Sequence, residues 1–389
     1  MNALRLTFAA GLLTSLTVGS IAADTATVES AAMENPLAAL GRDLFFDTRL
    51  SVPTGQACAT CHDPDHAFSD PRRSGAGGAL SLGADGHSLG DRNAPALTYA
   101  ARIPPFHQVG GDYAGGLFLD GRAPTLATQA REPLLNPLEM ALPDEAALAE
   151  RVLSLDAYRS RLAELFGPAV LEGGRATVDA ITTAIAAYER TEAFSTFDSR
   201  FDRSLTGEYE MTRDESIGQA LFFSDLTNCS QCHLNEVGRL SPDETFTSQG
   251  YHNIGVPVNP EARRANGLGS AHRDPGLGGR SDLPDAAVQA GRFRVPSLRN
   301  VAVTAPYMHN GVFQTLEAAV AFYGKYTLAN RPAQINPETG ETWAPPEIEQ
   351  NVDHDILRSG QPLDDQRVRQ LVAFLRTLTD ARYEHLLER

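Results

Sequence analysis

Two short segments, residues 58–62 and residues 229–233, share the pattern Cys-x-x-Cys-His. At this spacing two thiols can reach the vinyl groups of one haem while the adjacent imidazole ligates the iron. The motifs use all four cysteines of the chain, so no thiol remains for a disulfide framework or a Cys₄ zinc site. A thioredoxin-like thiol pair or a chance match is the alternative, but histidine follows directly in both copies. The motifs predict two covalent haems c, attached through Cys58, Cys61, Cys229 and Cys232, with His62 and His233 as axial ligands of the irons.

An internal duplication orders the chain around these motifs. Residues 41–47 (Gly-Arg-Asp-Leu-Phe-Phe-Asp) precede the first motif, and residues 218–224 (Gly-Gln-Ala-Leu-Phe-Phe-Ser) precede the second. Further pairs follow in the same order: residues 93–97 with 295–298, 120–121 with 310–311, and 125–126 with 315–316. Four matches in one order argue against chance similarity of short segments. The chain is therefore predicted to be a duplicated cytochrome c unit.

The elements that must hold these motifs are predicted to be helices. Apolar residues recur at helical spacing in residues 144–166, 176–190 and 364–387, the last as one long amphipathic helix. No segment predicts a sheet, so the expected fold is mainly α, with two cytochrome c-like domains and one haem in each. Residues 195–207 are mostly polar, and we place the domain boundary there. The N-terminal domain then spans residues 24–200 and the C-terminal domain residues 201–389.

The first 23 residues have the features of a secretory signal peptide. One positive charge at Arg5 precedes an apolar run over residues 6–21, and the small residues Ala22 and Ala23 precede Asp24. No basic cluster follows this short run, so we expect no membrane span. Export suits covalent haem attachment, which occurs outside the bacterial cytoplasm in the c-type proteins that the motifs resemble. The mature chain is expected in the periplasm.

The charge of the chain narrows the range of partners. Its formal net charge of -16 would repel nucleic acid and anionic lipid alike. A basic redox protein would be attracted instead. The length of 389 residues suffices for two domains that each have their own core.

The two halves differ where the second axial ligand is expected. When the repeats are superposed on residues 125–126 and 315–316, Pro133 falls at the position of Tyr323. Proline has no side-chain donor atom, so the first iron would keep an open face. Thr315 is the expected N-cap of a helix that carries Tyr323 on its buried face, from which the Tyr323 oxygen could ligate the second iron. Ligation by Met308 and a purely structural role for Tyr323 are the alternatives.

An open iron could bind peroxide, whereas a six-coordinate haem could only exchange electrons. Cleavage of the O–O bond also needs a base that moves a proton between the two oxygens. Glu139 and Gln129 flank Pro133 and are the candidates, although either could be a solvated loop residue. Glu132 follows Arg131 and is expected to pair at the surface instead.

The pattern as a whole resembles the bacterial di-haem cytochrome c peroxidase and MauG family over nearly all of the mature chain. The resemblance rests on the two haem motifs, on residues 91–95 and 120–122, and on residues 295–301 and 305–311. In the peroxidases the second haem is ligated by the methionine of Thr-Leu-Glu-x-Ala-Val-x-x-Met, and here residues 315–323 end in tyrosine. Tyrosine at that place is the MauG arrangement, and it favours ferric and higher oxidation states.

The resemblance implies roles for further residues. Gln129, Pro133 and Glu139 match the distal pocket of the first haem. Asn93 and the backbone carbonyls of Thr304 and Pro306 match a calcium site between the haems, where hard oxygen ligands are expected. MauG proteins share two oxidising equivalents from hydrogen peroxide across both haems and make tryptophan tryptophylquinone in methylamine dehydrogenase. The implied partners are hydrogen peroxide and a redox protein: a small cytochrome c, a cupredoxin or a quinoprotein precursor.

Several positions depart from the family pattern. Leu119 stands where the family usually has a tryptophan between the haems, and Thr227 stands where MauG has a surface tryptophan. The single tryptophan, Trp343, lies in an insertion-like loop. His87 is too close to Asn93 to match the mobile ligand of the peroxidases, and we expect it not to ligate. His252 resembles a haem-contacting segment.

The expected function is thus a MauG-like di-haem peroxidase that oxidises a protein donor or protein substrate. An ordinary peroxidase that takes electrons from a small cytochrome or cupredoxin is the nearest alternative. A non-catalytic di-haem electron carrier, with both irons six-coordinate, is an alternative of another class.

Overall fold

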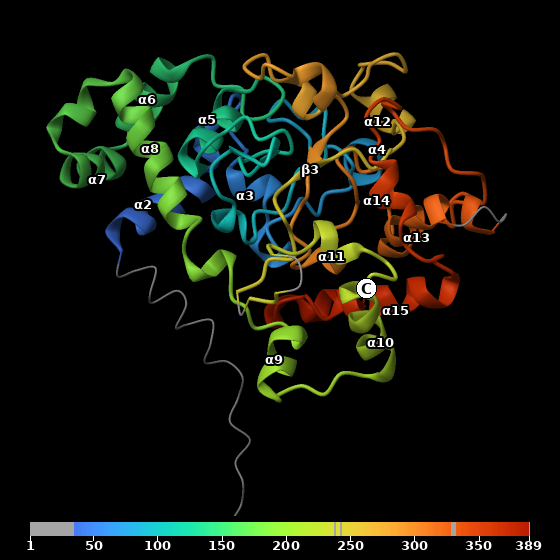
Figure 1. Ribbon diagram of the computed structural model, residues 1–389. Coiled ribbons are helices and arrows are strands. Elements are labelled where there is room, and N and C mark those ends of the chain that lie inside the picture. Colours follow the sequence, from blue (N-terminus) through green and yellow to red (C-terminus); the bar gives the residue numbers. More distant parts are fainter. Residues whose placement is uncertain (1–34, 237–238, 242, 328–331, 389) are drawn as a thin grey trace, which may run out of the picture.

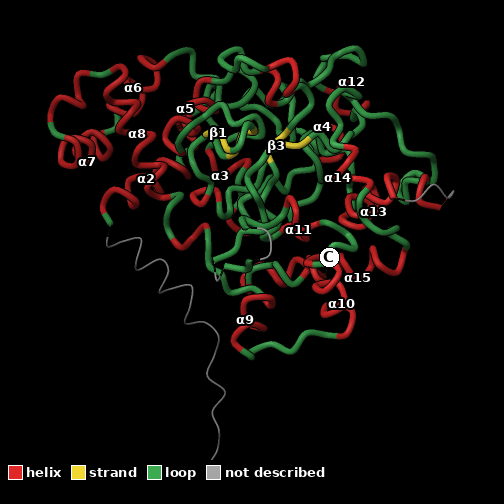
Figure 2. Tube along the Cα trace, viewed as in Figure 1, coloured by secondary structure: helices red, strands yellow, loops and turns green. Residues whose placement is uncertain are grey.

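The computed structural model describes residues 35–236, 239–241, 243–327 and 332–388, and these residues are mainly helical, as predicted. Figure 1 shows two groups of helices, one from each half of the chain, on either side of a region rich in loops. The same view coloured by secondary structure shows how much of this middle region is loop (Figure 2). The predicted signal peptide lies outside the described residues.

Helices of the first half are α2 (Pro36–Phe46), α3 (Cys58–Cys61), α4 (Gly75–Gly78), α5 (Leu126–Leu135), α6 (Glu145–Leu153), α7 (Asp156–Phe166) and α8 (Gly174–Tyr188). Those of the second half are α9 (Arg200–Thr206), α10 (Arg213–Phe223), α11 (Cys229–Cys232), α12 (Pro260–Ala265), α13 (Leu316–Thr327), α14 (His354–Arg358) and α15 (Asp365–Arg376). Two antiparallel ladders also occur: β1 (His107–Val109) with β2 (Asp112–Ala114), and β3 (Tyr251–His252) with β4 (Phe293–Arg294). The expectation of no sheet was therefore wrong for these short pairs.

In the first half, α2 packs on α8. The Asn35 side chain accepts hydrogen bonds from two backbone amides of the first turn of α2, which begins with Pro36. The apolar face of α2 buries Leu40, Leu44 and Phe45. These side chains join those of α8 in one hydrophobic cluster, which extends from Leu40 to Phe194 along the chain.

The second half repeats this arrangement with α10 packed on α15. Thr212 and Glu215 form a capping box at the start of α10, so two backbone amides that would lack partners are satisfied. The cluster of this half runs from Phe201 to Leu378 and contains Phe222 and Phe374. The chain passes from one large cluster to the other between Phe194 and Phe201. This stretch overlaps residues 195–207, and the domain boundary placed there stays a prediction.

Two of the predicted helices are interrupted. Residues 144–166 form α6 and α7 rather than one helix. The expected helix over residues 364–387 ends at Arg376, and a 3₁₀ helix follows from Ala381. Between them, the amide of Asp380 donates to the Asn300 side chain at 2.8 Å, and the amide of Asn300 donates to the Leu378 carbonyl at 3.0 Å. These long-range hydrogen bonds replace the local bonds of a continuous helix.

The loop before α5 joins the two halves. The Tyr251 hydroxyl donates to the Gly115 carbonyl at 2.6 Å, and the Arg294 amide donates to the Leu119 carbonyl at 2.9 Å. Arg92 and Asp274 form an ion pair across the same interface at 2.6 Å, with both side chains largely buried. The two haem motifs are therefore held on parts of the chain that pack directly against each other. Within the described residues, no helix is both long and apolar enough to cross a bilayer.

Candidate haem sites

Each haem motif forms a single helical turn that ends at its histidine. The amides of His62 and His233 donate to the carbonyls of Cys58 and Cys229, both at 2.9 Å. This turn brings the two cysteines and the histidine of each motif to one side of the chain. The four cysteines form no disulfide, so all of them are available to bond to haem vinyl groups.

Both histidines are oriented by the same contact. Nδ1 of His62 lies 3.1 Å from the carbonyl oxygen of Phe68, and Nδ1 of His233 lies 3.1 Å from that of Phe246. Phe68 and Phe246 share a left-handed backbone, with φ values of 54° and 55°. A hydrogen bond from Nδ1 fixes the tautomer and leaves Nε2 free as a ligand.

Burial also sets the protonation states of the two motifs. It lowers the pKa of His233 to about 4 and lowers that of His62, so both imidazoles are neutral and able to ligate metal at neutral pH. Burial raises the pKa of Cys58 to about 12 and that of Cys229 to about 11. The Arg72 guanidinium lies 3.0 Å from the sulfur of Cys61, a contact that the sequence pattern did not reveal.

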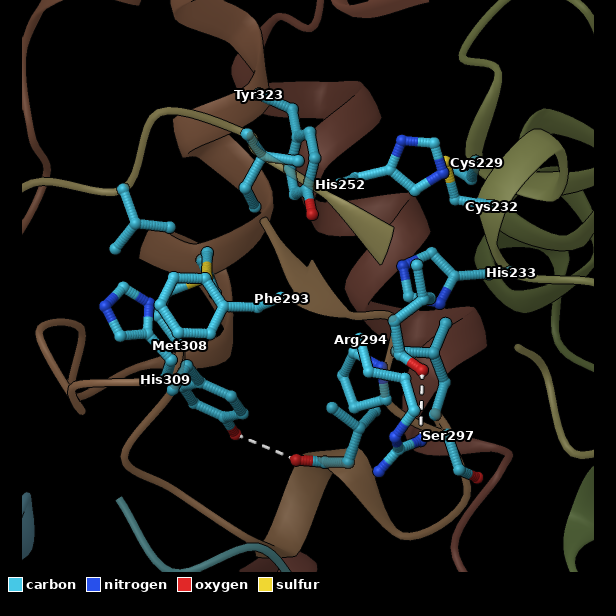
Figure 3. A pocket seen from close by; sticks show the side chains of 18 of the residues that line it. Cys229, Cys232, His233, His252, Phe293, Arg294, Ser297, Met308, His309 and Tyr323 are labelled. Carbon is cyan, nitrogen blue, oxygen red and sulfur yellow. Dashed lines mark hydrogen bonds between the residues drawn. The ribbon is translucent and has the colours of Figure 1, made fainter. Parts of the chain in front are cut away.

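The second motif opens on a cavity of about 380 Å³ (Figure 3). Its lining includes Cys229, Cys232, His233 and Tyr323, and most of the rest is apolar. A mostly apolar cavity of this size, with two thiols and one neutral imidazole on its wall, fits a haem c. The donors that would hold the group are thus brought together by α11 and α13.

Tyr323 and Met308, the two candidates for the second axial ligand, line this same cavity. The Tyr323 hydroxyl points into the cavity, while Met308 lies beside Phe293 and His309 (Figure 3). Burial raises the pKa of Tyr323, so the phenol is neutral unless a cation faces it. A bound ferric iron would oppose this shift and favour the phenolate. The choice between Tyr323 and Met308 as ligand stays a prediction.

Pro133 and Tyr323 occupy matching places on matching helices. Thr125 caps α5 and Thr315 caps α13, and each side-chain oxygen accepts from a backbone amide three residues later at 3.2 Å. Pro133 and Tyr323 each follow their cap by eight residues. Equal spacing from equal caps gives the two residues the same direction on their helices. A residue without a donor atom therefore stands where the other half has a phenol.

Gln129 lies one turn before Pro133 on the same face of α5, and both are half-buried. Glu139 follows in the next loop, where the Asn136 amide donates to its carboxylate at 2.9 Å. Burial raises the pKa values of Cys58 and Cys61, and the negative charge of Glu139 raises them further. Glu139 therefore lies close to the first haem motif. Burial raises the pKa of Glu139. Glu132 instead pairs with Arg122 at 2.8 Å on an exposed surface.

The three residues expected at a calcium site, Asn93, Thr304 and Pro306, all line the cavity of the second motif. The amide of Asn93 donates to the His309 carbonyl at 2.8 Å, which ties the first half to this segment. An amide side chain and backbone carbonyls are oxygen donors of the kind that Ca²⁺ accepts. Their role as ligands stays a prediction.

The remaining histidines differ in surroundings. The His87 side chain is 80% exposed and pairs with Asp85, and it is not part of the cavity lining. His252 lines the cavity, and its Nδ1 lies 2.6 Å from the Asp353 carboxylate. Asp353 was not identified from the sequence because it lies 101 residues from His252 along the chain.

The positions that depart from the family pattern lie in both halves, Leu119 in the first and Thr227 and Trp343 in the second. Leu119 lines the cavity. Thr227 contacts the Cys229 sulfur at 3.3 Å. The Trp343 indole is half-buried and donates to the Ala333 carbonyl at 2.8 Å.

Glu189, which the sequence analysis did not identify, is buried near Cys58. Only its position at the end of a helical segment could have drawn attention to it.

A family model described as di-haem cytochrome c peroxidase matches residues 35–210. The methylamine utilization protein MauG of Paracoccus denitrificans is 53% identical over 91% of this chain and 91% of that protein. The cytochrome c551 peroxidase of Nitrosomonas europaea is 32% identical over 75% of this chain and 74% of its own length. Among solved structures, the diheme peroxidase BthA of Burkholderia thailandensis matches with a TM-score of 0.77 and 36% identity, covering 89% of this chain and 86% of that one.

The chain therefore belongs to the di-haem cytochrome c peroxidase and MauG family, whose members are oxidoreductases with two haems c. Within the family it is a MauG-like di-haem peroxidase, as the sequence predicted. It is accordingly an enzyme, and the alternative of a non-catalytic electron carrier is not supported.

Proposed function

We propose that this chain is a periplasmic MauG-like peroxidase that uses hydrogen peroxide at the N-terminal haem, shares the oxidising equivalents with the C-terminal haem, and oxidises a protein substrate. The observation that carries the proposal is the difference between Pro133 and Tyr323 at equivalent places on α5 and α13. One iron would keep a free position for peroxide, and the other would be closed by an oxygen donor. In this proposal residues 24–200 hold the first haem and residues 201–389 the second, after removal of residues 1–23.

A haem, when bound at either site, supplies an iron that can gain and lose electrons. His62, whose Nδ1 is hydrogen-bonded to the Phe68 carbonyl, would hold the first iron through Nε2. Pro133 has no donor atom and would supply no ligand to this iron. The Glu139 carboxylate would accept a proton from one peroxide oxygen and return it to the other, and Gln129 would hydrogen-bond to the peroxide. General acid–base catalysis of this kind contributes about 10²- to 10⁴-fold in rate.

At the second site His233 and Tyr323 would both hold the iron. An anionic phenolate stabilises ferric and higher oxidation states, whereas a thioether stabilises the ferrous state. A site with Tyr323 is therefore suited to store an oxidising equivalent. This property distinguishes the proposed function from electron storage in a methionine-ligated haem.

We include one Ca²⁺ in the proposal, bound by the Asn93 side chain and the carbonyls of Thr304 and Pro306. These oxygens come from both halves of the chain, so the ion would stabilise the relative position of the two haems. Calcium content is tested by metal analysis after dialysis, with Asn93→Ala as the variant. If Asn93→Ala retains one equivalent of Ca²⁺, Asn93 is not a ligand of the ion.

The substrate is proposed from the relatives. Three of them are named methylamine utilization proteins MauG, and the family resemblance implies tryptophan tryptophylquinone formation in methylamine dehydrogenase. A precursor of that quinoprotein is thus the first substrate to test. Leu119 and Thr227, which replace two tryptophans of the family pattern, favour the second candidate: an ordinary peroxidase that takes electrons from a small cytochrome c or a cupredoxin.

Two measurements test the proposal. An electron paramagnetic resonance (EPR) spectrum of the ferric protein should contain one high-spin signal from the open site and one low-spin signal from the closed site. One equivalent of hydrogen peroxide should then remove both signals, and Mössbauer spectroscopy should find both irons oxidised. Two low-spin signals would contradict an open N-terminal site. Peroxide turnover with a reduced small cytochrome, without oxidation of a tryptophan precursor, would favour the second candidate.

A further inference from the structure

Tyr99 is a buried phenol at the contact between the two halves. Its hydroxyl donates to Asp380 Oδ1 at 2.6 Å and accepts from the Phe197 amide at 3.1 Å. Tyr99 is 2% exposed and Asp380 is 0% exposed. The other carboxylate oxygen of Asp380 accepts from the Asn300 side chain at 2.8 Å. Tyr99 therefore reaches from the N-terminal half to a carboxylate that is anchored in the C-terminal half.

The internal duplication shows that this tyrosine is unusual. Residues 93–99 correspond to residues 294–300, so Tyr99 is the counterpart of Asn300. Both residues adopt a left-handed backbone, with φ of 63° and 62°, just before a one-turn 3₁₀ helix. Asparagine tolerates this conformation, whereas a bulky aromatic residue is strained there. The first half thus keeps a strained residue where a small amide serves in the second half.

Tyr99 lies between the two candidate haem sites. On one side it lines the cavity that also contains His233 and Leu119. On the other side its amide donates to the Phe194 carbonyl at 2.8 Å, and the Phe194 ring stacks on Phe68 at 4.0 Å. The backbone carbonyl of Phe68 is hydrogen-bonded to the imidazole of His62. Leu119 lies on the wall of the same cavity, but its aliphatic side chain cannot give up an electron to an oxidised haem.

The surroundings of Tyr99 suit a coupled loss of an electron and a proton. A phenol that loses an electron must also lose its proton, and a carboxylate in hydrogen-bond contact can accept it. Burial raises the pKa of Tyr99, so the phenol keeps its proton in the resting protein. Burial also raises the pKa of Asp380, but its two side-chain donors and Arg299 oppose that shift.

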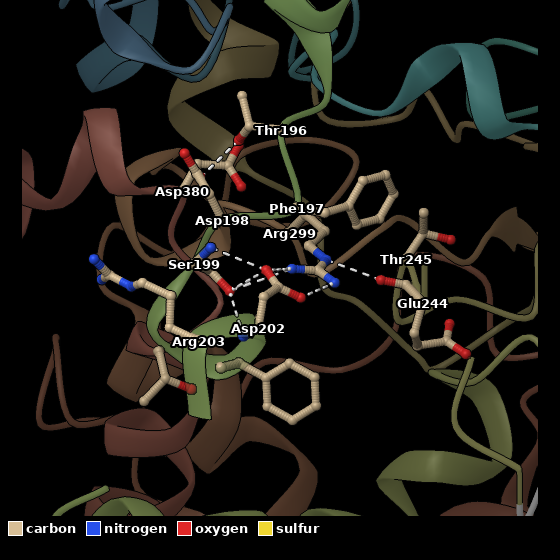
Figure 4. Close-up of polar contacts among 12 residues, drawn as sticks. Thr196, Phe197, Asp198, Ser199, Asp202, Arg203, Glu244, Thr245, Arg299 and Asp380 are labelled. Carbon is tan, nitrogen blue, oxygen red and sulfur yellow. Dashed lines mark hydrogen bonds and ion pairs between the residues drawn. The ribbon is translucent and has the colours of Figure 1, made fainter. Parts of the chain in front are cut away.

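Arg299 completes this environment without contacting the hydroxyl. Its guanidinium lies 5.5 Å from the Tyr99 ring centroid and 5.0 Å from that of Phe197. It forms an ion pair with Asp202, and its Nε donates to the Glu244 carbonyl at 2.9 Å (Figure 4). The positive charge is therefore compensated locally, and Asp380 remains the group positioned to accept the phenolic proton.

We infer that Tyr99 is a redox-active residue that carries single electrons from the C-terminal haem site to the N-terminal haem site. This role rests on the proposed function, because it concerns how the two sites share oxidising equivalents. Tyr99 would give one electron to the oxidised N-terminal site as its O–H bond breaks and the proton moves to Asp380 Oδ1. One electron from the C-terminal site would then reduce the tyrosyl radical, and the proton would return from Asp380. The net result is the transfer of one electron, with no net movement of protons.

The haem-loaded protein with one equivalent of hydrogen peroxide provides the test. Freeze-quenched samples are followed by EPR for the loss of the high-spin and low-spin ferric signals and for an organic radical. Tyr99→Phe is compared with Tyr158→Phe, a matched control in which the hydroxyl also donates to a buried carboxylate, Asp47, at 2.8 Å. Tyr158 lies within the N-terminal cluster and not on the cavity wall.

We expect a transient radical signal that narrows when tyrosine is ring-deuterated and that is missing in Tyr99→Phe. Loss of the low-spin signal should be at least tenfold slower in Tyr99→Phe than in Tyr158→Phe, while loss of the high-spin signal keeps its rate. Equal rates of low-spin loss in both variants would overturn the role of Tyr99. If peroxide removes neither ferric signal in the unmodified protein, the proposed function itself fails, so the two failures can be told apart.

Asp380→Asn gives a second measurement if Tyr99→Phe does not fold, as judged by circular dichroism. Asparagine keeps an acceptor for the hydroxyl but cannot take its proton. In the unmodified protein, loss of the low-spin signal should slow at least twofold in D₂O. Asp380→Asn should slow this loss tenfold or more at unchanged high-spin loss. An Asp380→Asn protein with the original rate and the original solvent isotope effect would also overturn the inference.

Discussion

Gly41 and Gly218 hold the same place in the two halves, each where one helix crosses another at backbone contact. A Cβ atom on Gly41 would lie 1.8 Å from the carbonyl oxygen of Ala184 on α8. A Cβ atom on Gly218 would lie 1.9 Å from the carbonyl oxygen of Gln370 on α15. Because the obstacles are backbone atoms, the helices themselves must separate to accept any side chain.

Gly41→Ala and Gly218→Ala should therefore each lower the free energy of unfolding by about 1–3 kcal/mol or more, the usual cost of overpacking. Urea denaturation followed by circular dichroism measures this change. Gly90→Ala is the control, since the nearest atom to its Cβ would be 3.8 Å away. Stability of Gly41→Ala equal to that of the control would contradict the close crossing of α2 and α8.

Tyr323→Met should raise the reduction potential of the C-terminal haem, because a thioether stabilises ferrous iron better than a phenolate. We expect a rise on the order of 100 mV, within the range that axial ligands control. Met308→Leu should leave the potential nearly unchanged. Spectroelectrochemical titration measures both variants, and the opposite pattern would make Met308 the ligand in place of Tyr323.

Glu139→Gln should slow the reaction of the ferric protein with hydrogen peroxide by about 10²- to 10⁴-fold, because the amide cannot accept the peroxide proton. Stopped-flow absorbance measures the rate. Glu132→Gln, on the exposed ion pair with Arg122, should react like the unmodified protein.

The pH dependence of the same reaction provides an independent check on Glu139. Burial raises the pKa of its carboxyl, so the fraction of active carboxylate should begin to fall at a higher pH than for an exposed glutamate. The rate should decline on acidification in the unmodified protein and lack this decline in Glu139→Gln. An identical pH profile in both proteins would assign the base to another group.

Glu189 should make stability depend on pH. Burial raises its pKa to about 8, and its Oε2 atom has no hydrogen-bond partner. The folded protein then keeps a proton that the unfolded chain, with the ordinary pKa of 4.5, releases. The free energy of unfolding should thus fall as the pH rises from about 4.5 to about 8, by an amount on the order of a few kcal/mol.

Glu189→Gln should remove most of this fall, because the amide does not ionise. Unfolding by urea at pH 5 and pH 8 measures it in both proteins. Glu192→Gln, at an exposed position three residues away, should keep the pH dependence of the unmodified protein. A fall that persists in Glu189→Gln would mean that another group titrates.

The sequence by itself determined what depends on neighbouring residues. The two Cys-x-x-Cys-His motifs, the Thr315 cap and the order of the duplicated parts all follow from spacing within a few residues. Helical periodicity likewise indicated α8 closely. Family membership followed from these local patterns, because they combine at fixed intervals along the chain.

Only the tertiary structure decided what depends on distant residues. The contact of Tyr99 with Asp380 joins positions 281 residues apart, and that of His252 with Asp353 joins positions 101 apart. Such a contact also explains why α15 ends at Arg376, since the Asn300 side chain accepts a hydrogen bond from the amide of Asp380 in the turn that follows. No local pattern encodes these pairs, because packing of the two halves brings them together and burial then makes each hydrogen bond necessary.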